Sequence, residues 1–160
     1  MGASRHTDQQ AQEIYQDLLD RIAHAYTSDD FEAYARMIRV PHEVRSFGPR
    51  VEINTRAELR VLFDGLRVSL ARRGIKDYVR TCLAAKWVSP TEIIGTHETR
   101  MIANNQIVEE PYPVKSVLRH IDGAWWVCSS DNALGTDSDF GTVLAHSNIR
   151  PFPRKKRNER

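Results

Sequence analysis

The sequence predicts an α+β domain in which three N-terminal helices pack against a curved antiparallel sheet of about four long strands plus a short hairpin. In the first part of the chain, apolar residues recur every three or four positions, which is typical of helices. Between about residues 77 and 131, the strand pattern dominates instead. Hairpin signals separate the later segments, so consecutive strands are expected to pair. The 160 residues suffice for one domain with its own core.

Two helices are expected near the N-terminus. Residues 1–9 are expected to be disordered, and residues 10–26 to form an amphipathic helix. Asp29 followed by Glu32 resembles a capping box, which predicts a second, shorter helix that ends at Pro41. The apolar face of the first helix is formed by Ala11, Ile14, Tyr15, Leu18, Ile22 and Tyr26.

A short hairpin and a third helix follow. Residues 42–54 alternate with a period of two around a Gly-Pro turn at 48–49, which predicts a β-hairpin. Thr55 and Glu58 form a capping box that is expected to begin the third helix. Gly74 is expected to end that helix, because glycine readily adopts the left-handed conformation found there.

Four long strands account for the rest of the domain. Asp122-Gly123 is the clearest hairpin signal in the chain. The strands are expected near residues 77–89, 92–103, 113–121 and 124–131.

Apolar side chains occupy both faces of the first long strand. By simple alternation, one face carries Val79, Leu83 and Trp87, and the other face carries Tyr78, Cys82, Ala84 and Val88. A sheet with one solvated face would alternate more cleanly between apolar and polar residues. We therefore expect a second copy of the chain to cover the open face of the sheet.

Charge is distributed unevenly along the chain. Residues 150–160 hold six basic residues and one acid, so the remainder carries more acids than bases. We expect residues 10–134 to form the domain and residues 135–160 a C-terminal extension with a solvated basic tail, so nucleic acid is not an expected partner.

Membrane spans and a signal peptide are not expected, which favours the cytoplasm as the location of the protein. Cys82 and Cys128 are then expected to be reduced thiols.

This order of elements resembles the nuclear-transport-factor-2-like (NTF2-like) superfamily, which includes SnoaL-like polyketide cyclases and ketosteroid isomerase. The resemblance covers residues 9–134 and is most specific at residues 27–31, 55–63 and 119–127, the last reading Arg-His-Ile-Asp-Gly-Ala-Trp-Trp-Val. It implies an uncharacterised SnoaL-like member with a cone-shaped, cystatin-like fold. It also implies a homodimer joined through the open sheet face, and a pocket between the sheet and the helices.

The resemblance does not extend to ketosteroid isomerase chemistry. At the positions where that enzyme has its base, its acidic hydrogen-bond donor and its tyrosine, this chain has about Ser46, Lys115 or Ser116, and Ile22. A proton shuttle needs a group that takes and returns the proton. Isomerase chemistry of that type is therefore not expected.

The sequence leaves the catalytic residues undetermined. His97, Asp131 and Tyr15 are candidates, although His97 is also typical of a hydrogen-bonded interior histidine. The strand pattern leaves open whether Lys115 faces the pocket or the edge of the sheet. The residues expected to line a ligand pocket are Tyr15, Leu18, Tyr34, Phe47 and Phe63, with His97 or Lys115 as polar contacts.

No metal or cofactor is expected. His42-Glu43 and His97-Glu98 match half of a zinc motif, but Ser46 and Met101 stand where the second histidine would be. Nucleophile elbows and phosphate-binding glycine loops are missing as well.

Three functions stay open from the sequence. The first is a domain that binds a small, largely apolar ligand without a declared reaction. The second is a hydratase, cyclase or isomerase that acts on a small hydrophobic compound. The third is a protein-interaction module.

Overall fold

The computed structural model describes residues 6–45, 50–108 and 110–132. The predictions for residues 1–5, for the turn at 48–49 and for the whole 135–160 extension lie outside them. The helices are α1 (Asp8–Ser28), α2 (Phe31–Ala35) and α3 (Arg56–Arg72), and the strands are β1 (Ile38–Arg45), β2 (Val51–Ile53), β3 (Asp77–Ser89), β4 (Glu92–Ala103), β5 (Gln106–Ile107), β6 (Tyr112–Ile121) and β7 (Ala124–Asn132).

The first helix is confirmed and is slightly longer than predicted. Thr7 caps it, since its hydroxyl accepts a hydrogen bond from the backbone of Gln10 while the Gln10 side chain accepts one from the backbone of Thr7. The helix ends at Asp29, which adopts a left-handed conformation with φ 55°. Thr55 similarly caps α3 by accepting from the Glu58 backbone.

The second helix is shorter than predicted. Asp30 caps it rather than Asp29, because Asp29 is already the C-cap of α1. The helix ends at Ala35, and the chain enters β1 at Ile38. The prediction that helix continues to Pro41 is therefore wrong: Pro41 lies inside β1 and follows a cis peptide bond.

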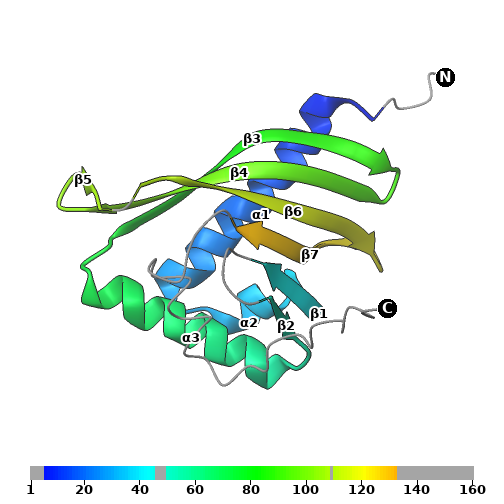
Figure 1. The fold of residues 1–160 in the computed structure, drawn as a ribbon. Coiled ribbons are helices and arrows are strands. Elements are labelled where there is room, and N and C mark those ends of the chain that lie inside the picture. Colours follow the sequence, from blue (N-terminus) through cyan, green and yellow to red (C-terminus); the bar gives the residue numbers. More distant parts are fainter. Residues whose placement is uncertain (1–5, 46–49, 109, 133–160) are drawn as a thin grey trace, which may run out of the picture.

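The long strands form the predicted antiparallel ladders, but the complete sheet is mixed. Its strand order is β2-β1-β7-β6-β4-β3, with β5 paired to β4. The β1–β2 hairpin was predicted from its period of two, and it pairs antiparallel as expected. However, β1 joins the sheet by lying parallel to β7, a long-range pairing that local sequence patterns do not reveal. Figure 1 shows α1 crossing one face of the curved sheet, with α3 beyond its lower edge.

A bulge in β3 changes which side chains share a face. Cys82 pairs with His97 and Ala84 pairs with Thr96, so Leu83 is an extra residue in the ladder. Beyond the bulge the alternation is inverted, and Trp87 turns toward α1, where its indole N–H donates to the Thr7 carbonyl at 2.9 Å. The expectation that Trp87 shares a face with Leu83 is therefore wrong.

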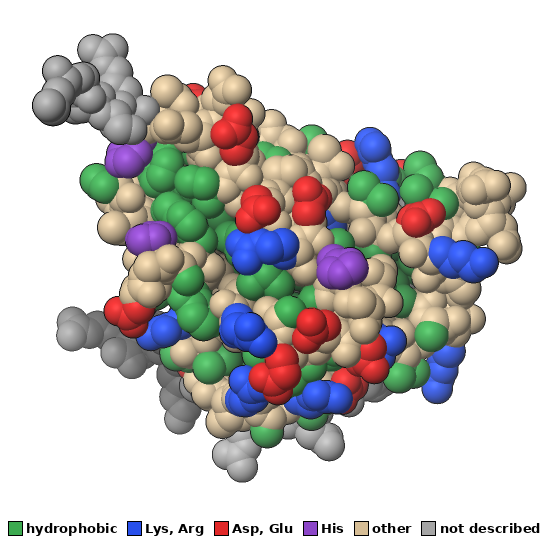
Figure 2. Space-filling view, turned by 180° about the vertical axis from the view of Figure 1, so that it is seen from behind, with side chains coloured by type: hydrophobic (Ala, Val, Ile, Leu, Met, Phe, Trp, Pro, Cys, Tyr) green, Lys and Arg blue, Asp and Glu red, His purple; other side chains and the backbone are tan. Residues whose placement is uncertain are grey.

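The core fills the space between α1, α3 and the concave face of the sheet. Its largest wholly buried side chains include Tyr15, Leu18, Phe63, Ile93 and Leu118. Figure 2 views the molecule from the α1 side, where acidic and basic side chains intersperse with apolar ones. The described helices contain no segment long and apolar enough to cross a membrane.

The opposite, outer face of the sheet carries apolar side chains in the open. On β3, Val79, Leu83 and Val88 are 42%, 56% and 57% exposed. They alternate with the side chains that β3 turns toward α1. The apolar character of both faces, which the sequence predicted for this strand, is thus present in the structure.

Candidate functional site

A cavity of about 60 Å³ lies inside the cone, between α1, α3 and the concave face of the sheet. A single buried water needs on the order of 10–15 Å³, so this space has room for several waters or a small molecule. Its apolar walls include Leu18, Ile22, Leu62, Leu66, Val114 and Leu118. Polar side chains also line it, and they come from helices α1 and α2 and from the concave face of strands β1, β3, β4, β6 and β7.

Three of the polar side chains around this space form a chain of hydrogen bonds. The hydroxyl of Tyr15, on α1, lies 2.6 Å from Nδ1 of His97, on β4. Nε2 of His97 lies 2.9 Å from Nη2 of Arg80, on β3. Tyr15 and Arg80 line the cavity, whereas His97 is wholly buried behind them.

The partner of Nε2 determines the tautomer of His97. A guanidinium can only donate hydrogen bonds, so Nε2 must accept from Arg80. Burial, reinforced by the positive charge of Arg80, lowers the pKa of His97 to about 2, so the ring is neutral. Its single proton is then on Nδ1 and is donated to the Tyr15 oxygen. The Tyr15 hydroxyl hydrogen is left for another acceptor.

Tyr15 is itself held in place by small neighbours. Gly95 lies directly beneath the Tyr15 ring, where a Cβ atom would overlap the ring carbons. Burial raises the pKa of Tyr15 to about 12, and hydrogen bonding with Ser116 offsets part of that increase. Tyr15 is therefore an uncharged hydroxyl at neutral pH.

Arg80 is the one arginine that the sheet turns toward the cavity among the described residues. Its Nε is buried and has no hydrogen-bond partner there. The Gln16 amide, on α1, donates to the Arg80 carbonyl at 2.9 Å and accepts from the Cys82 amide at 2.8 Å, which fixes this part of β3 against α1. The guanidinium carbon lies 6.0 Å from the centre of the Tyr78 ring.

Two phenols near Arg80, those of Tyr26 and Tyr34, are neutral at physiological pH. Burial raises the pKa of Tyr26 well above its usual value and that of Tyr34 to about 12. The two phenols also bond to each other, with Tyr26 donating to Tyr34 at 3.0 Å. Burial disfavours the charge of Arg80 itself, but the neighbouring tyrosines outweigh this effect and raise its pKa. Arg80 therefore stays positively charged.

His42 supplies a second unsatisfied polar atom on the other side of the cavity. It lies on β1, is 4% exposed, and its Nδ1 has no partner among the described residues. Burial lowers the pKa of His42 to about 4, although hydrogen bonding to the backbone at Val127 and Cys128 opposes the shift. The ring is therefore neutral at physiological pH.

Two predicted site residues lie outside the cone. Lys115 and Asp131 are exposed and line a separate surface groove of about 220 Å³. Strand β6 turns Val114 and Ser116 inward, so the intervening Lys115 must point outward. The expectation that Lys115 contacts a ligand in the conical pocket is therefore wrong, and Asp131 has no access to that pocket either.

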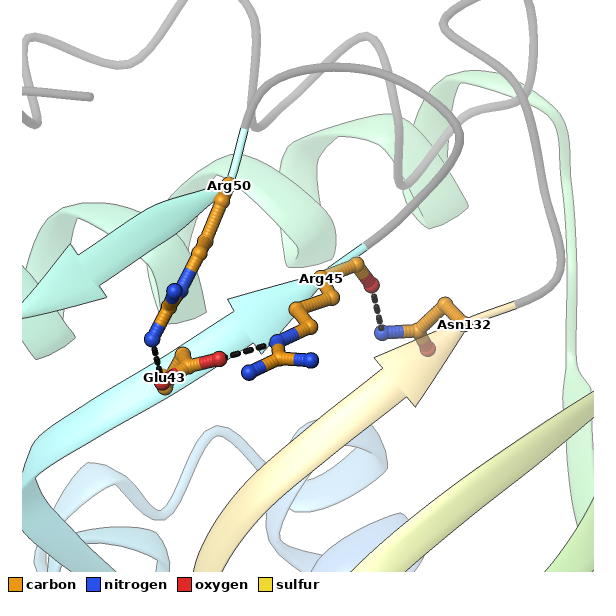
Figure 3. Close-up of polar contacts among 4 residues, drawn as sticks. All are labelled: Glu43, Arg45, Arg50 and Asn132. Atoms are coloured by element: carbon orange, nitrogen blue, oxygen red, sulfur yellow. Dashed lines mark hydrogen bonds and ion pairs between the residues drawn. The ribbon is translucent and has the colours of Figure 1, made fainter. Parts of the chain in front are cut away.

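An ion-pair cluster holds this outer surface together. Glu43 accepts hydrogen bonds from Arg45 and Arg50, and the Asn132 amide donates to the Arg45 carbonyl at 3.2 Å (Figure 3). Burial raises the pKa of Glu43, but the two arginines outweigh burial and hold it below its usual value. The cluster thereby links β1 to the start of β2 and to β7. Its role is to stabilise the pairing of these strands.

The remaining predicted lining residues divide into three cases. Tyr15, Leu18 and Tyr34 line the cavity, and their contact with a ligand stays a prediction. Phe63 is wholly buried but does not line it, because its ring packs on Tyr26 with centroids 5.2 Å apart. Phe47 lies outside the described residues.

Sequence reasoning missed Arg80, although a signal was present. Tyr78 and Cys82 were assigned to one face of the strand, and Arg80 stands between them at the same period. A charged residue on an apolar strand face is unusual and marks a candidate site. As for metals, the described residues contain no group of three or more His, Cys, Asp or Glu side chains placed to hold an ion.

Comparison with known proteins gives a fold but no sequence family. Neither a family model nor a curated protein matches this sequence. Among solved structures, Rv3472 from Mycobacterium tuberculosis, a protein of unknown function, is 20% identical with a TM-score of 0.63, over 91% of this chain and 92% of that one. An NTF2-like protein of unknown function from Shewanella oneidensis is 13% identical with a TM-score of 0.60, over 76% and 98% of the two chains.

An enzyme also shares the architecture. The hexachlorocyclohexane dehydrochlorinase LinA-type3 from Novosphingobium barchaimii is 14% identical with a TM-score of 0.55, over 78% of this chain and 86% of that one. Proteins of this architecture therefore include both enzymes and proteins without a known activity, and identities this low carry no reaction from one to another. The arrangement of helices and sheet, together with these similarities, establishes that the chain has the NTF2-like, cystatin-like fold.

Proposed function

We propose that this chain binds a small, largely apolar molecule in the cavity of its cone. The observation that carries the proposal is a cavity in which aliphatic side chains alternate with phenol, hydroxyl, imidazole and guanidinium groups, and concave sites that combine apolar walls with placed polar groups are typical of small-molecule binding. The cavity persists although Tyr15 and Phe63 pack tightly beside it. A volume of about 60 Å³ favours a ligand much smaller than a steroid.

An enzymatic function, as a hydratase, cyclase or isomerase of the same fold, is the second candidate. The contact between Tyr15 and His97 beside the cavity favours it, as does the dehydrochlorinase among the similar structures. However, both ring nitrogens of His97 are engaged and its pKa is lowered to about 2, which makes it a weak general base. We therefore place binding first.

We also propose that the protein is a homodimer joined through the outer face of the sheet. The exposed Val79, Leu83 and Val88 support this arrangement, since burial of such side chains drives association. A module that binds a different protein would use the same surface. The free thiols of Cys82 and Cys128 support a reducing location, for which we propose the cytoplasm.

Native mass spectrometry of protein purified without added ligand tests the binding proposal. We expect a bound small molecule that is lost when the protein is denatured. The Val114→Phe variant should fill the cavity and lose the adduct. Val117→Phe, the same change on the outward side of the same strand, should retain it. Circular dichroism establishes that both variants are folded. The proposal fails if the wild type carries no adduct, or if both variants retain it equally.

A further inference from the structure

The charge of Arg80 stands apart from the other charges of the protein. The surface arginines Arg21, Arg67, Arg100 and Arg119 each contact an Asp or Glu carboxylate at 2.7–3.1 Å. Arg80 has no such partner among the described residues. Its neighbours are phenol rings and the neutral His97. The most enclosed of these cations is thus the one without a counter-charge.

Such an arrangement is energetically costly. An ion removed from water is stable in a protein only if a partner charge and hydrogen bonds replace its hydration. Among the described residues, Arg80 has one side-chain hydrogen-bond partner, at 2.9 Å, and its buried Nε has none. Tyr15, Tyr26 and Tyr34 do not supply the charge, because burial raises the pKa of each and keeps their hydroxyls protonated. An anion from outside the chain would supply it.

The guanidinium is also fixed in direction. His97 accepts from Nη2, and Tyr15 in turn accepts from His97, so the fork of Arg80 is tied through two buried hydrogen bonds to α1. Gln16 fixes the Arg80 backbone from the same helix. A rigid planar fork with an unpaired N–H suits a planar carboxylate better than it suits a spherical ion.

From these relationships we infer that the ligand of the cavity is a small monocarboxylic acid, whose carboxylate pairs with Arg80 and whose apolar part lies against Leu18, Ile22 and Leu66. The inference rests on the proposed binding function and names its ligand class. Among the described residues, Arg80 is the one Arg, Lys, Asp or Glu side chain that lines the cavity, which favours a ligand with a single charge, and the cavity of about 60 Å³ limits the acid to a short chain or a single ring.

Isothermal titration with butanoate, hexanoate and benzoate, each compared with the amide of the same skeleton, tests this inference. At least one of the acids should bind about tenfold or more tightly than its amide, because a hydrogen bond to a charged group is stronger than one between neutral groups. Arg80→Met should weaken acid binding by about tenfold or more and leave amide binding nearly unchanged. Arg100→Met, an exposed arginine on the neighbouring strand, is the matched control and should bind like the wild type.

The outcomes separate this inference from the proposed function. If the amides bind as well as the acids, or Arg80→Met binds the acids normally, the assignment of a carboxylate is overturned while binding in the cone stands. If neither series binds and native mass spectrometry shows no adduct, both are overturned. Thermal unfolding of each variant verifies that lost binding is not lost folding.

Discussion

The hydroxyl of Tyr15 and Nδ1 of His97, 2.6 Å apart, join α1 to the centre of the sheet through a buried hydrogen bond. Tyr15→Phe removes the acceptor and leaves the Nδ1–H of His97 unsatisfied. An unsatisfied buried group costs about 1–3 kcal/mol, and we expect the free energy of unfolding in urea to fall by that amount. Tyr78→Phe is the control, because the Tyr78 hydroxyl forms no hydrogen bond with the other described residues. Equal losses for the two variants would contradict the proposed bond.

Gly95 is expected to be required by the Tyr15 ring above it. In Gly95→Ala the new methyl overlaps the ring carbons, and overpacking of this kind costs about 1–3 kcal/mol. A double-mutant cycle, with the free energy of unfolding measured in urea, gives the interaction energy between positions 95 and 15. On a Tyr15→Leu background the same glycine substitution should cost much less, because the ring is gone. Additive losses would mean that the backbone of β4, and not Tyr15, requires the glycine.

Arg80→Met is expected to leave the ligand-free protein as stable as the wild type, or more stable. Replacing buried charged groups with apolar residues of similar volume is often neutral or stabilising, by about 1–4 kcal/mol for ion pairs, and Arg80 is a partly buried charge with no counter-charge among the described residues. Loss of the bond to His97 opposes this gain. Chemical denaturation after exhaustive dialysis measures the balance, with Arg100→Met as the surface control. A loss well beyond that of the control would assign Arg80 a structural role.

Acid is expected to destabilise the protein through His42. Its pKa is about 4 in the folded state and about 6.5 in the unfolded state, so the unfolded chain binds more protons between these values. Stability should therefore fall as the pH drops from about 6.5 to 4, by up to about 3 kcal/mol from this residue. Urea titrations across this range check it. His42→Gln should reduce the slope without abolishing it, because His97, whose pKa is lowered to about 2, contributes over the same range. Substitution of the exposed His24 by Gln should leave the dependence unchanged.

The outer face of the sheet is expected to mediate self-association. Leu83 is an extra residue in its ladder and is 56% exposed there. Leu83→Arg places a charge in the proposed dimer interface and should convert a dimer into a monomer in sedimentation velocity experiments. Val68→Arg, at a similarly exposed position on α3, should leave the mass unchanged. A wild type that sediments as a monomer would refute the dimer.

Much of the fold was predictable because its determinants are local. The N-cap at Thr55, the left-handed Gly74 just after α3, the Asp-Gly turn at 122–123 and the periodicity of the strands all act within a few residues. The pairing of β1 with β7 and the bulge at Leu83 were not predictable in this way. Both depend on contacts between segments far apart in the sequence, for which a single chain gives no periodic signal.

A candidate site residue could be placed from the sequence only where alternation along its own strand decided which face of the sheet it occupies. His97 falls on the buried face of β4 together with Gly95 and Met101, as alternation predicts. Lys115 required the register of β6, and a shift by one residue moves a side chain to the opposite face. Arg80 was not predicted as a site residue, because a single charged residue breaks the apolar pattern of its strand face. Its contacts with His97 and Tyr78 become evident only in the structure.

The parallel ladder between β1 and β7 has a consequence for biosynthesis. The Val127 amide donates to the Met37 carbonyl at 2.8 Å, and Ser129 pairs with Glu43. The first strand to be synthesised, β1, therefore cannot join the sheet until the last strand, β7, has left the ribosome. Until β7 emerges, the β1–β2 hairpin has no partner in the sheet, and one wall of the cavity is missing. Because such distant contacts close late, we expect nascent chains that stop before residue 124 to be protease-sensitive, and the domain to fold in a single late step.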